Sequence, residues 1–196
     1  MRTIRRAIIF CLAAVSSASV IAQSKTDPAR GAAKAAACGA CHGSPKSAPL
    51  AGMPALAGQQ AEFLAMQMFL LREGLRDVPQ MAGMLAGWSD TDLNEVAAYF
   101  AAQAPPRSSG SRDPAIHARG AALAQTMGCG SCHMGAYQGQ RQIPRIANQR
   151  EDYLAASLTA YRDNKQTGID TSMNAAMYRV SDEDIKALAH YLAHQQ

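Results

Sequence analysis

Apolar residues recur at intervals of three and four along most of the chain, which is the spacing of one face of an α-helix. This pattern predicts helices over residues 28–38, 60–74, 114–129 and 150–164, and the first and third of these segments are rich in alanine, the strongest helix former. No stretch of useful length alternates between apolar and polar residues as a half-buried strand does. The chain is therefore predicted to be all-α.

Two further helices are predicted from their capping signatures. Ser89 and Ser181 are each followed three residues later by an aspartate, the arrangement that satisfies free backbone N–H groups at a helix start. Apolar residues at helical spacing then define the face expected to point inward: Leu93, Val96, Ala97 and Phe100 in one helix, and Ile185, Leu188, Ala189 and Leu192 in the other.

The second half of the chain repeats the first. The pattern P-x-L/I-x-x-Q at 54–59 returns at 144–149, and S-D-T-D-L at 89–93 returns as S-D-E-D-I at 181–185. The offset is 90 residues for the first pattern and 92 for the second, and self-similarity at a nearly constant offset indicates a duplicated structural unit. We therefore predict two domains.

The boundary between the copies is rich in proline, serine and glycine and lacks apolar periodicity, so it is predicted to be a linker. We place the domains at 23–104 and 113–196 and the linker at 105–112. A linker this short should keep the two domains in contact.

The first 22 residues have the pattern of a secretory signal peptide, with three arginines, an apolar run and small residues that end at Ala22. We expect cleavage near Ala22, which would also discard Cys11; an uncleaved amino-terminal anchor is the alternative. No other stretch approaches the roughly 20 apolar residues that span a membrane. The mature protein is predicted to be periplasmic, which leaves room for peripheral association with the membrane.

Removal of the signal changes the charge balance. The whole chain has 19 Lys and Arg against 15 Asp and Glu, whereas residues 23–196 have 16 against 15. A mature net charge of +1 gives little support to nucleic-acid binding. We expect no nucleic-acid partner.

Each half contains one Cys-x-x-Cys-His sequence, formed by Cys38, Cys41 and His42 in the first and by Cys129, Cys132 and His133 in the second. This pattern is typical of c-type haem attachment, in which both thiols bind the porphyrin covalently and the histidine ligates the iron. A single such motif could also form a redox dithiol or half a zinc site. An offset of 91 residues is too long for one zinc site, and both motifs follow helical runs. We predict two covalently bound haem c groups, which would also enlarge the thin core of each half.

The sixth position on each iron separates electron transfer from chemistry on small molecules. Met81 and Met173 lie 39 and 40 residues after their histidines, each eight residues before the capping serine. We predict that they are the second axial ligands, with Met84 as the rival of Met81.

Two other recurrences concern the surroundings of the haems. Pro54 and Pro144 follow each histidine by about a dozen residues, and we expect their carbonyls to orient the imidazoles. Arg72 and Arg162 recur at an offset of 90. The interpretation favoured for these arginines is a solvated surface charge, with pairing to a haem propionate as the alternative.

The sequence resembles the cytochrome c4 family, on C-G-A-C-H-G at 38–43, P-A-L-A-G-Q at 54–59, M-A-G-M-L at 81–85 with W-S-D-T-D-L after it, and the counterparts in the second half. The resemblance implies two tandem class I cytochrome c domains, each wrapped around one covalently attached haem and related by a pseudo-twofold axis. It also implies His/Met ligation at both irons and a role in passing electrons to terminal oxidases. Asn148, where the family has glycine, and the short loop after His42 depart from the pattern.

The leading hypothesis is a non-enzymatic one-electron carrier of a respiratory chain. Its donor would be a quinol-oxidising complex or a dehydrogenase, and its acceptor a terminal oxidase. One alternative is an electron-accepting subunit of a periplasmic dehydrogenase complex. A dihaem peroxidase is a less favoured one, since it needs an iron with an open or displaceable ligand.

Overall fold

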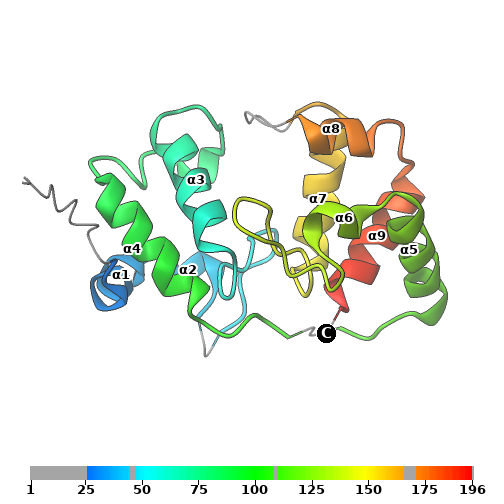
Figure 1. The fold of residues 1–196 in the computed structure, drawn as a ribbon, viewed down its shortest axis with the longest axis horizontal. Helices are drawn as coiled ribbons and strands as arrows, with labels where there is room; N and C mark the ends of the chain where they lie inside the picture. The colour runs from blue at the N-terminus through cyan, green and yellow to red at the C-terminus, as the bar shows by residue number, and fades with distance from the viewer. Residues whose placement is uncertain (1–25, 45–46, 108–109, 166–170, 196) are drawn as a thin grey trace, which may run out of the picture.

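The computed structural model describes residues 26–44, 47–107, 110–165 and 171–195, and the predicted signal peptide with its cleavage point lies outside these residues. Within them the chain is helical, and the helices form two groups side by side (Figure 1). The first group contains α1 (Pro28–Ala35), α2 (Gly39–His42), α3 (Ala61–Arg72), the 3₁₀ helix η1 (Pro79–Met81) and α4 (Asp90–Ala101). The second contains α5 (Pro114–Thr126), α6 (Cys129–His133), α7 (Glu151–Arg162), α8 (Ser172–Met177) and α9 (Asp182–Ala193).

The helix starts are fixed by side-chain caps. The Ser89 hydroxyl accepts a hydrogen bond from Asp92 N–H at 3.2 Å, and the Asp92 carboxylate accepts one from Ser89 N–H at 2.9 Å, which completes a capping box at α4. Ser181 likewise accepts from Asp184 N–H at α9. The capping signatures read in the sequence are thereby confirmed.

The same packing scheme is used in both groups. Helix α4 packs against α1 and α3, and helix α9 packs against α5 and α7. All eight residues expected to point inward from α4 and α9 are buried. The first core consists of Ala35, Leu64, Val96, Ala97 and Phe100.

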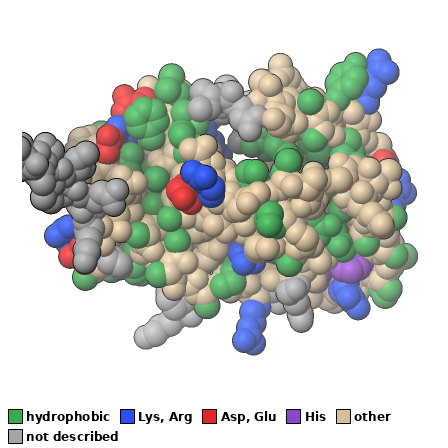
Figure 2. All heavy atoms as spheres, in the orientation of Figure 1, with side chains coloured by type: hydrophobic (Ala, Val, Ile, Leu, Met, Phe, Trp, Pro, Cys, Tyr) green, Lys and Arg blue, Asp and Glu red, His purple; other side chains and the backbone are tan. Residues whose placement is uncertain are grey.

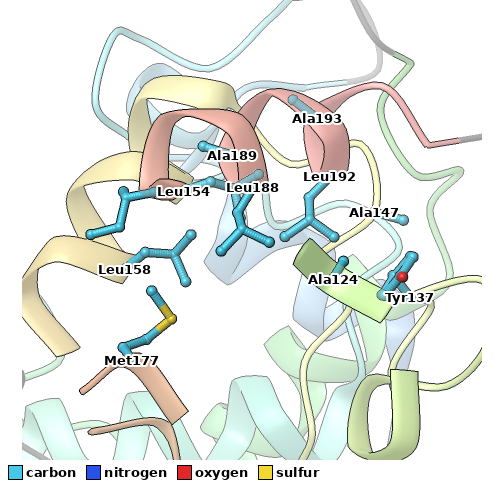
Figure 3. Packing of buried hydrophobic residues seen from close by; sticks show 11 residues of the cluster. Ala124, Tyr137, Ala147, Leu154, Leu158, Met177, Leu188, Ala189, Leu192 and Ala193 are labelled. Atoms are coloured by element: carbon cyan, nitrogen blue, oxygen red, sulfur yellow. The ribbon is translucent and has the colours of Figure 1, made fainter. Parts of the chain in front are cut away.

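The second core is built from three long helices and the short α8. Figure 3 shows Leu154 and Leu158 from α7 and Leu188 and Leu192 from α9 directed toward a common interior, with Met177 facing them from α8. Each group thus presents an apolar wall beside its Cys-x-x-Cys-His motif.

The two groups touch through their loops. The loop between α6 and α7 lies between the groups in Figure 1, and it is hydrogen-bonded to residues of the first group. The expected contact between the halves is therefore confirmed.

On the face shown in Figure 2, basic and acidic side chains are scattered among hydrophobic and neutral ones. None of the described helices is long and apolar enough to cross a membrane.

Candidate haem-binding sites

The two Cys-x-x-Cys-His motifs form short helical turns, α2 and α6, at equivalent places in the two groups. In each motif the first thiol is half-buried and the second is exposed, and all four are free. Burial raises the pKa of the Cys38 and Cys129 thiols. The two thiols of each motif thus lie on one short turn and differ in exposure.

Both histidines of the motifs are held by a proline carbonyl of their own half. His42 Nδ1 lies 2.9 Å from Pro54 O, and His133 Nδ1 lies 2.9 Å from Pro144 O. Since a carbonyl oxygen only accepts, Nδ1 carries the hydrogen in each ring, and Nε2 keeps the lone pair that a metal needs. The prediction that these prolines orient the imidazoles is confirmed.

Burial also favours the metal-binding form of the second histidine. His133 is 6% exposed. Desolvation lowers its pKa, with the Pro144 hydrogen bond acting in the opposite direction. Burial therefore favours the neutral ring, the form in which histidine binds a metal.

The two methionine segments differ in structure. Met81 ends η1 and is half-buried, whereas its rival Met84 is 53% exposed. Met173 is the second residue of α8 and packs against the second core. The burial favours Met81 over Met84, because a thioether ligand has to lie on the inner side of its segment.

The donors present in each half fit a c-type haem: two free thiols on one turn, an imidazole whose Nδ1 is bonded to a proline carbonyl, a thioether and a wall of apolar side chains. A haem in the second half would use His133 with Cys129 and Cys132, beside the core residues of Figure 3. His42 with Cys38 and Cys41 would serve the first half.

The interpretation of Arg72 and Arg162 as solvated surface charges is wrong. Their side chains are only 16% and 21% exposed. Arg72 donates to Trp88 O at 2.9 Å and to Asp90 at 2.8 Å, and Arg162 donates to Val180 O at 3.3 Å and to Asp182. Each arginine thus ties the end of the middle helix to the start of the last helix. Sequence spacing could not reveal this, because one partner of each arginine is a backbone carbonyl and the other is a carboxylate 18 or 20 residues away.

A second cluster of possible metal ligands has another role. Glu151, His190 and His194 offer donor atoms within 4.8 Å of one another. Both nitrogens of His190 are already used, with Nδ1 donating to Glu151 and Nε2 accepting from Asp113 N–H, each at 3.0 Å. This histidine therefore joins α7 and α9 to the start of α5.

Two buried residues were missed as functional candidates: Gln59 and Gln149, which are 6% and 8% exposed. Each bonds to the backbone of the opposite half next to a histidine-binding proline. Their signal in the sequence was the return of a glutamine at the end of both P-x-L/I-x-x-Q segments.

Known proteins share both the sequence and the fold. Cytochrome c4 of Pseudomonas aeruginosa is 37% identical over 88% of this chain and 90% of its own length. The chain belongs to the cytochrome c4 family. A crystal structure of reduced cytochrome c4 from Pseudomonas stutzeri matches with a TM-score of 0.79 and 32% identity, covering 87% of this chain and 99% of the other. A family model described as cytochrome c matches residues 117–196.

Membership in the family confirms the predicted fold class, the haem cofactors and the general role. The chain consists of two tandem class I cytochrome c domains, carries two covalently bound haem c groups and acts in electron transport. A thiosulfate dehydrogenase electron acceptor of Stutzerimonas stutzeri is also similar, at 32% identity over 81% of this chain and 79% of its own length.

Proposed function

We propose that the chain is a periplasmic dihaem carrier of a respiratory chain. It takes single electrons from a quinol-oxidising complex or a dehydrogenase and delivers them to a terminal oxidase. The observation that carries the proposal is the duplicated imidazole geometry, in which a proline carbonyl fixes Nδ1 of His42 and of His133 and leaves Nε2 free. A haem c iron supplies one-electron oxidation and reduction at each site.

The residues have the following roles in this proposal. The thiols would form the thioether attachments, and the histidines and methionines would be the iron ligands: Cys38, Cys41, His42 and Met81 in the first domain, and Cys129, Cys132, His133 and Met173 in the second. A thioether at each iron would leave neither site open to water or a substrate. Electron exchange then needs no bond to form or break, which makes the protein a carrier rather than an enzyme.

The test is the absorption spectrum of the haem-loaded protein in both redox states, for the wild type and for Met81→Ala and Met173→Ala. We expect the weak near-infrared sulfur-to-iron band of the oxidised protein to lose about half its intensity in each variant and to vanish in the double variant. The matched control is Met84→Ala, because Met84 is largely exposed three residues after Met81. A band that keeps its full intensity in Met81→Ala but loses about half of it in Met84→Ala would assign the first-domain ligand to Met84.

Two simpler measurements test the site as a whole. Mass spectrometry of the periplasmic protein should show two added haems, with Cys41→Ser and Cys132→Ser each weakening attachment in one domain only. The same sample tests export, because the mature chain should begin near residue 23. A precursor that keeps its first 22 residues on the membrane would instead indicate an uncleaved anchor.

A second candidate function is that of electron-accepting partner of a dehydrogenase. It is favoured by the similarity to the thiosulfate dehydrogenase electron acceptor. The structure of thiosulfate dehydrogenase TsdBA from Marichromatium purpuratum also matches, over 87% of this chain and 40% of its own length, with a TM-score of 0.74 and 29% identity. Stopped-flow reduction by such a dehydrogenase, compared with oxidation by membranes containing a terminal oxidase, separates the two candidates.

A dihaem peroxidase remains the third hypothesis, and its spectroscopic signature differs. It predicts a high-spin iron in one redox state and turnover of hydrogen peroxide. The carrier predicts two low-spin irons in both states and no turnover.

A further inference from the structure

Two buried glutamines each bind the backbone of the opposite half of the molecule. Gln149 forms two hydrogen bonds with the backbone of Ala55, which donates its N–H to Oε1 at 2.8 Å and accepts from Nε2 at 2.9 Å. Gln59 binds Arg145 in the same way, with N–H to Oε1 at 2.6 Å and Nε2 to O at 2.9 Å. Both glutamines and both backbone partners are related by an offset of 90 residues. The contact is therefore reciprocal.

The orientation of each amide is fixed by its partners. Oε1 of Gln149 also accepts from Arg150 N–H, and Oε1 of Gln59 also accepts from Gln60 N–H, each at 2.9 Å. Only this orientation places the amide oxygen on two N–H donors and the nitrogen on a carbonyl. Since both side chains are buried, water does not compete for these bonds.

Each glutamine binds the peptide group that orients the histidine of the opposite half. The peptide between Pro54 and Ala55 accepts from His42 through its C=O and donates to Gln149 through its N–H. The peptide between Pro144 and Arg145 does the same for His133 and Gln59. One planar peptide group therefore separates each imidazole from a glutamine of the other domain.

Hydrogen bonds on the two sides of one peptide group strengthen each other. An acceptor on the N–H increases the negative charge on the C=O, which then holds the imidazole N–H more strongly. A stronger bond at Nδ1 makes the imidazole a better electron donor through Nε2, which favours the oxidised metal.

We propose that Gln149 and Gln59 are positioning residues for the axial histidines of the opposite domain. Gln149 sets the donor strength of His42, and Gln59 sets that of His133, so each haem potential depends on the presence of the other domain. The inference rests on the proposed ligation by these two histidines.

The alternative is that the glutamines only hold the two domains together. Gln60 offers the matched control, because its side chain also crosses the interface, donating to Gln138 O at 2.8 Å. The peptide that it binds donates through Gly139 N–H to the backbone carbonyl of His133 at 3.0 Å and not to an imidazole ring. If interface contact alone mattered, loss of the Gln60 bond would have the same effect as loss of the Gln149 bond.

The experiment compares Gln149→Leu, Gln59→Leu and Gln60→Leu with the wild type as haem-loaded proteins. In the reduced, diamagnetic state, nuclear magnetic resonance reads the Nδ1–H protons of His42 and His133. Spectroelectrochemical titration reads the two midpoint potentials. We expect Gln149→Leu to shift the His42 proton upfield and to raise the first-domain potential, with Gln59→Leu doing the same to His133 and the second-domain potential.

Each substitution should thus act on the domain that does not contain it, and Gln60→Leu should leave both ring protons in place. Equal shifts at both histidines, no shift at either, or the same shift from Gln60→Leu would overturn the inference while leaving the carrier function standing. A wild-type protein without histidine-ligated haems would instead overturn the proposed function. Gln149→Met, which keeps the length of the side chain without an acceptor on its end, gives the same comparison if the leucine variant folds poorly.

Discussion

Gly120 of α5 lies directly against the backbone carbonyl of Ala187 on α9, so closely that a Cβ on Gly120 would sit 2.1 Å from that oxygen. Gly31 of α1 meets the carbonyl of Glu95 on α4 at the same 2.1 Å. In both domains the first and last helices therefore cross backbone to backbone at a glycine. This crossing holds the segment leading into each Cys-x-x-Cys-His motif against the core.

The first prediction concerns this crossing. Gly120→Ala should lower the free energy of unfolding by about 1–3 kcal/mol, because the added methyl group forces α5 away from α9. Denaturant unfolding of the haem-loaded protein measures the loss. Gly135→Ala is the control, since a Cβ there has no heavy atom within 4 Å, and an equal loss in both variants would contradict the prediction.

A second prediction concerns the buried carboxylate of Glu95. Its side chain is 2% exposed and accepts hydrogen bonds from Arg30, including one from Nε at 2.8 Å. Arg30→Met should destabilise the protein strongly, because the carboxylate is left buried without its partner. The same change in a Glu95→Gln background should have a much smaller effect.

Arg119 provides the comparison for that double-mutant cycle. It occupies the position of Arg30 in the second domain but pairs with Asp184, whose side chain is 25% exposed. Arg119→Met should therefore cost less stability than Arg30→Met. If the two variants lose similar amounts of unfolding free energy, burial of Glu95 does not determine the cost of removing its arginine.

The third prediction concerns acid. Arg150 lowers the pKa of Asp152 from its ordinary 3.8 to about 2, with a further bond from Gly52 N–H of the first domain at 2.9 Å. Since the folded pKa lies below the unfolded one, the contribution of Asp152 is complete above pH 4 and disappears as the pH falls toward 2. The stability difference between wild type and Asp152→Asn should shrink over that interval. Denaturant titrations at several pH values measure it, and a difference that stays constant would be the contrary result.

The fourth prediction concerns Asn148, which stands where the family has glycine. Its φ is +57°, and its buried Oδ1 has no hydrogen-bond partner among the residues that the structure describes. Asn148→Gly should raise the free energy of unfolding by about 1 kcal/mol. Glycine adopts a positive φ without strain and leaves no buried oxygen unpaired, and these two gains outweigh its extra conformational freedom in the unfolded chain.

The equivalent residue of the first domain gives the reverse test. Gly58 has a φ of +66°, and a Cβ there would lie 2.8 Å from the backbone of Pro105. Gly58→Ala should therefore be destabilising. Thermal unfolding compares the two variants, and a stabilised Gly58→Ala would contradict this account.

The helices and much of the sites could be predicted from local patterns. Apolar spacing fixed the inward face of α4 and α9, and the recurrence of Pro54 and Pro144 was enough to expect their bonds to the histidines. These features depend on residues close in sequence or on a strict repeat. Periodicity and duplication report both kinds directly.

The contacts that the sequence could not predict join distant segments through polar groups. Glu95 lies on the buried side of α4 next to Val96, and nothing in its spacing shows that Arg30 covers it. Repetition also concealed a difference, because Met81 ends a 3₁₀ turn whereas Met173 begins an α-helix. Two methionines at the same place in the repeat therefore lie in different types of helix.

The exchanged glutamine bonds have the form of an isologous interface, in which the same surface patch serves both partners. Two separate copies of one such domain could associate through this patch as a homodimer, whose population would fall on dilution. Fusion through a short linker replaces that association with an intramolecular one, at an effective concentration on the order of millimolar. The pairing of the two halves is therefore independent of how much protein the cell makes.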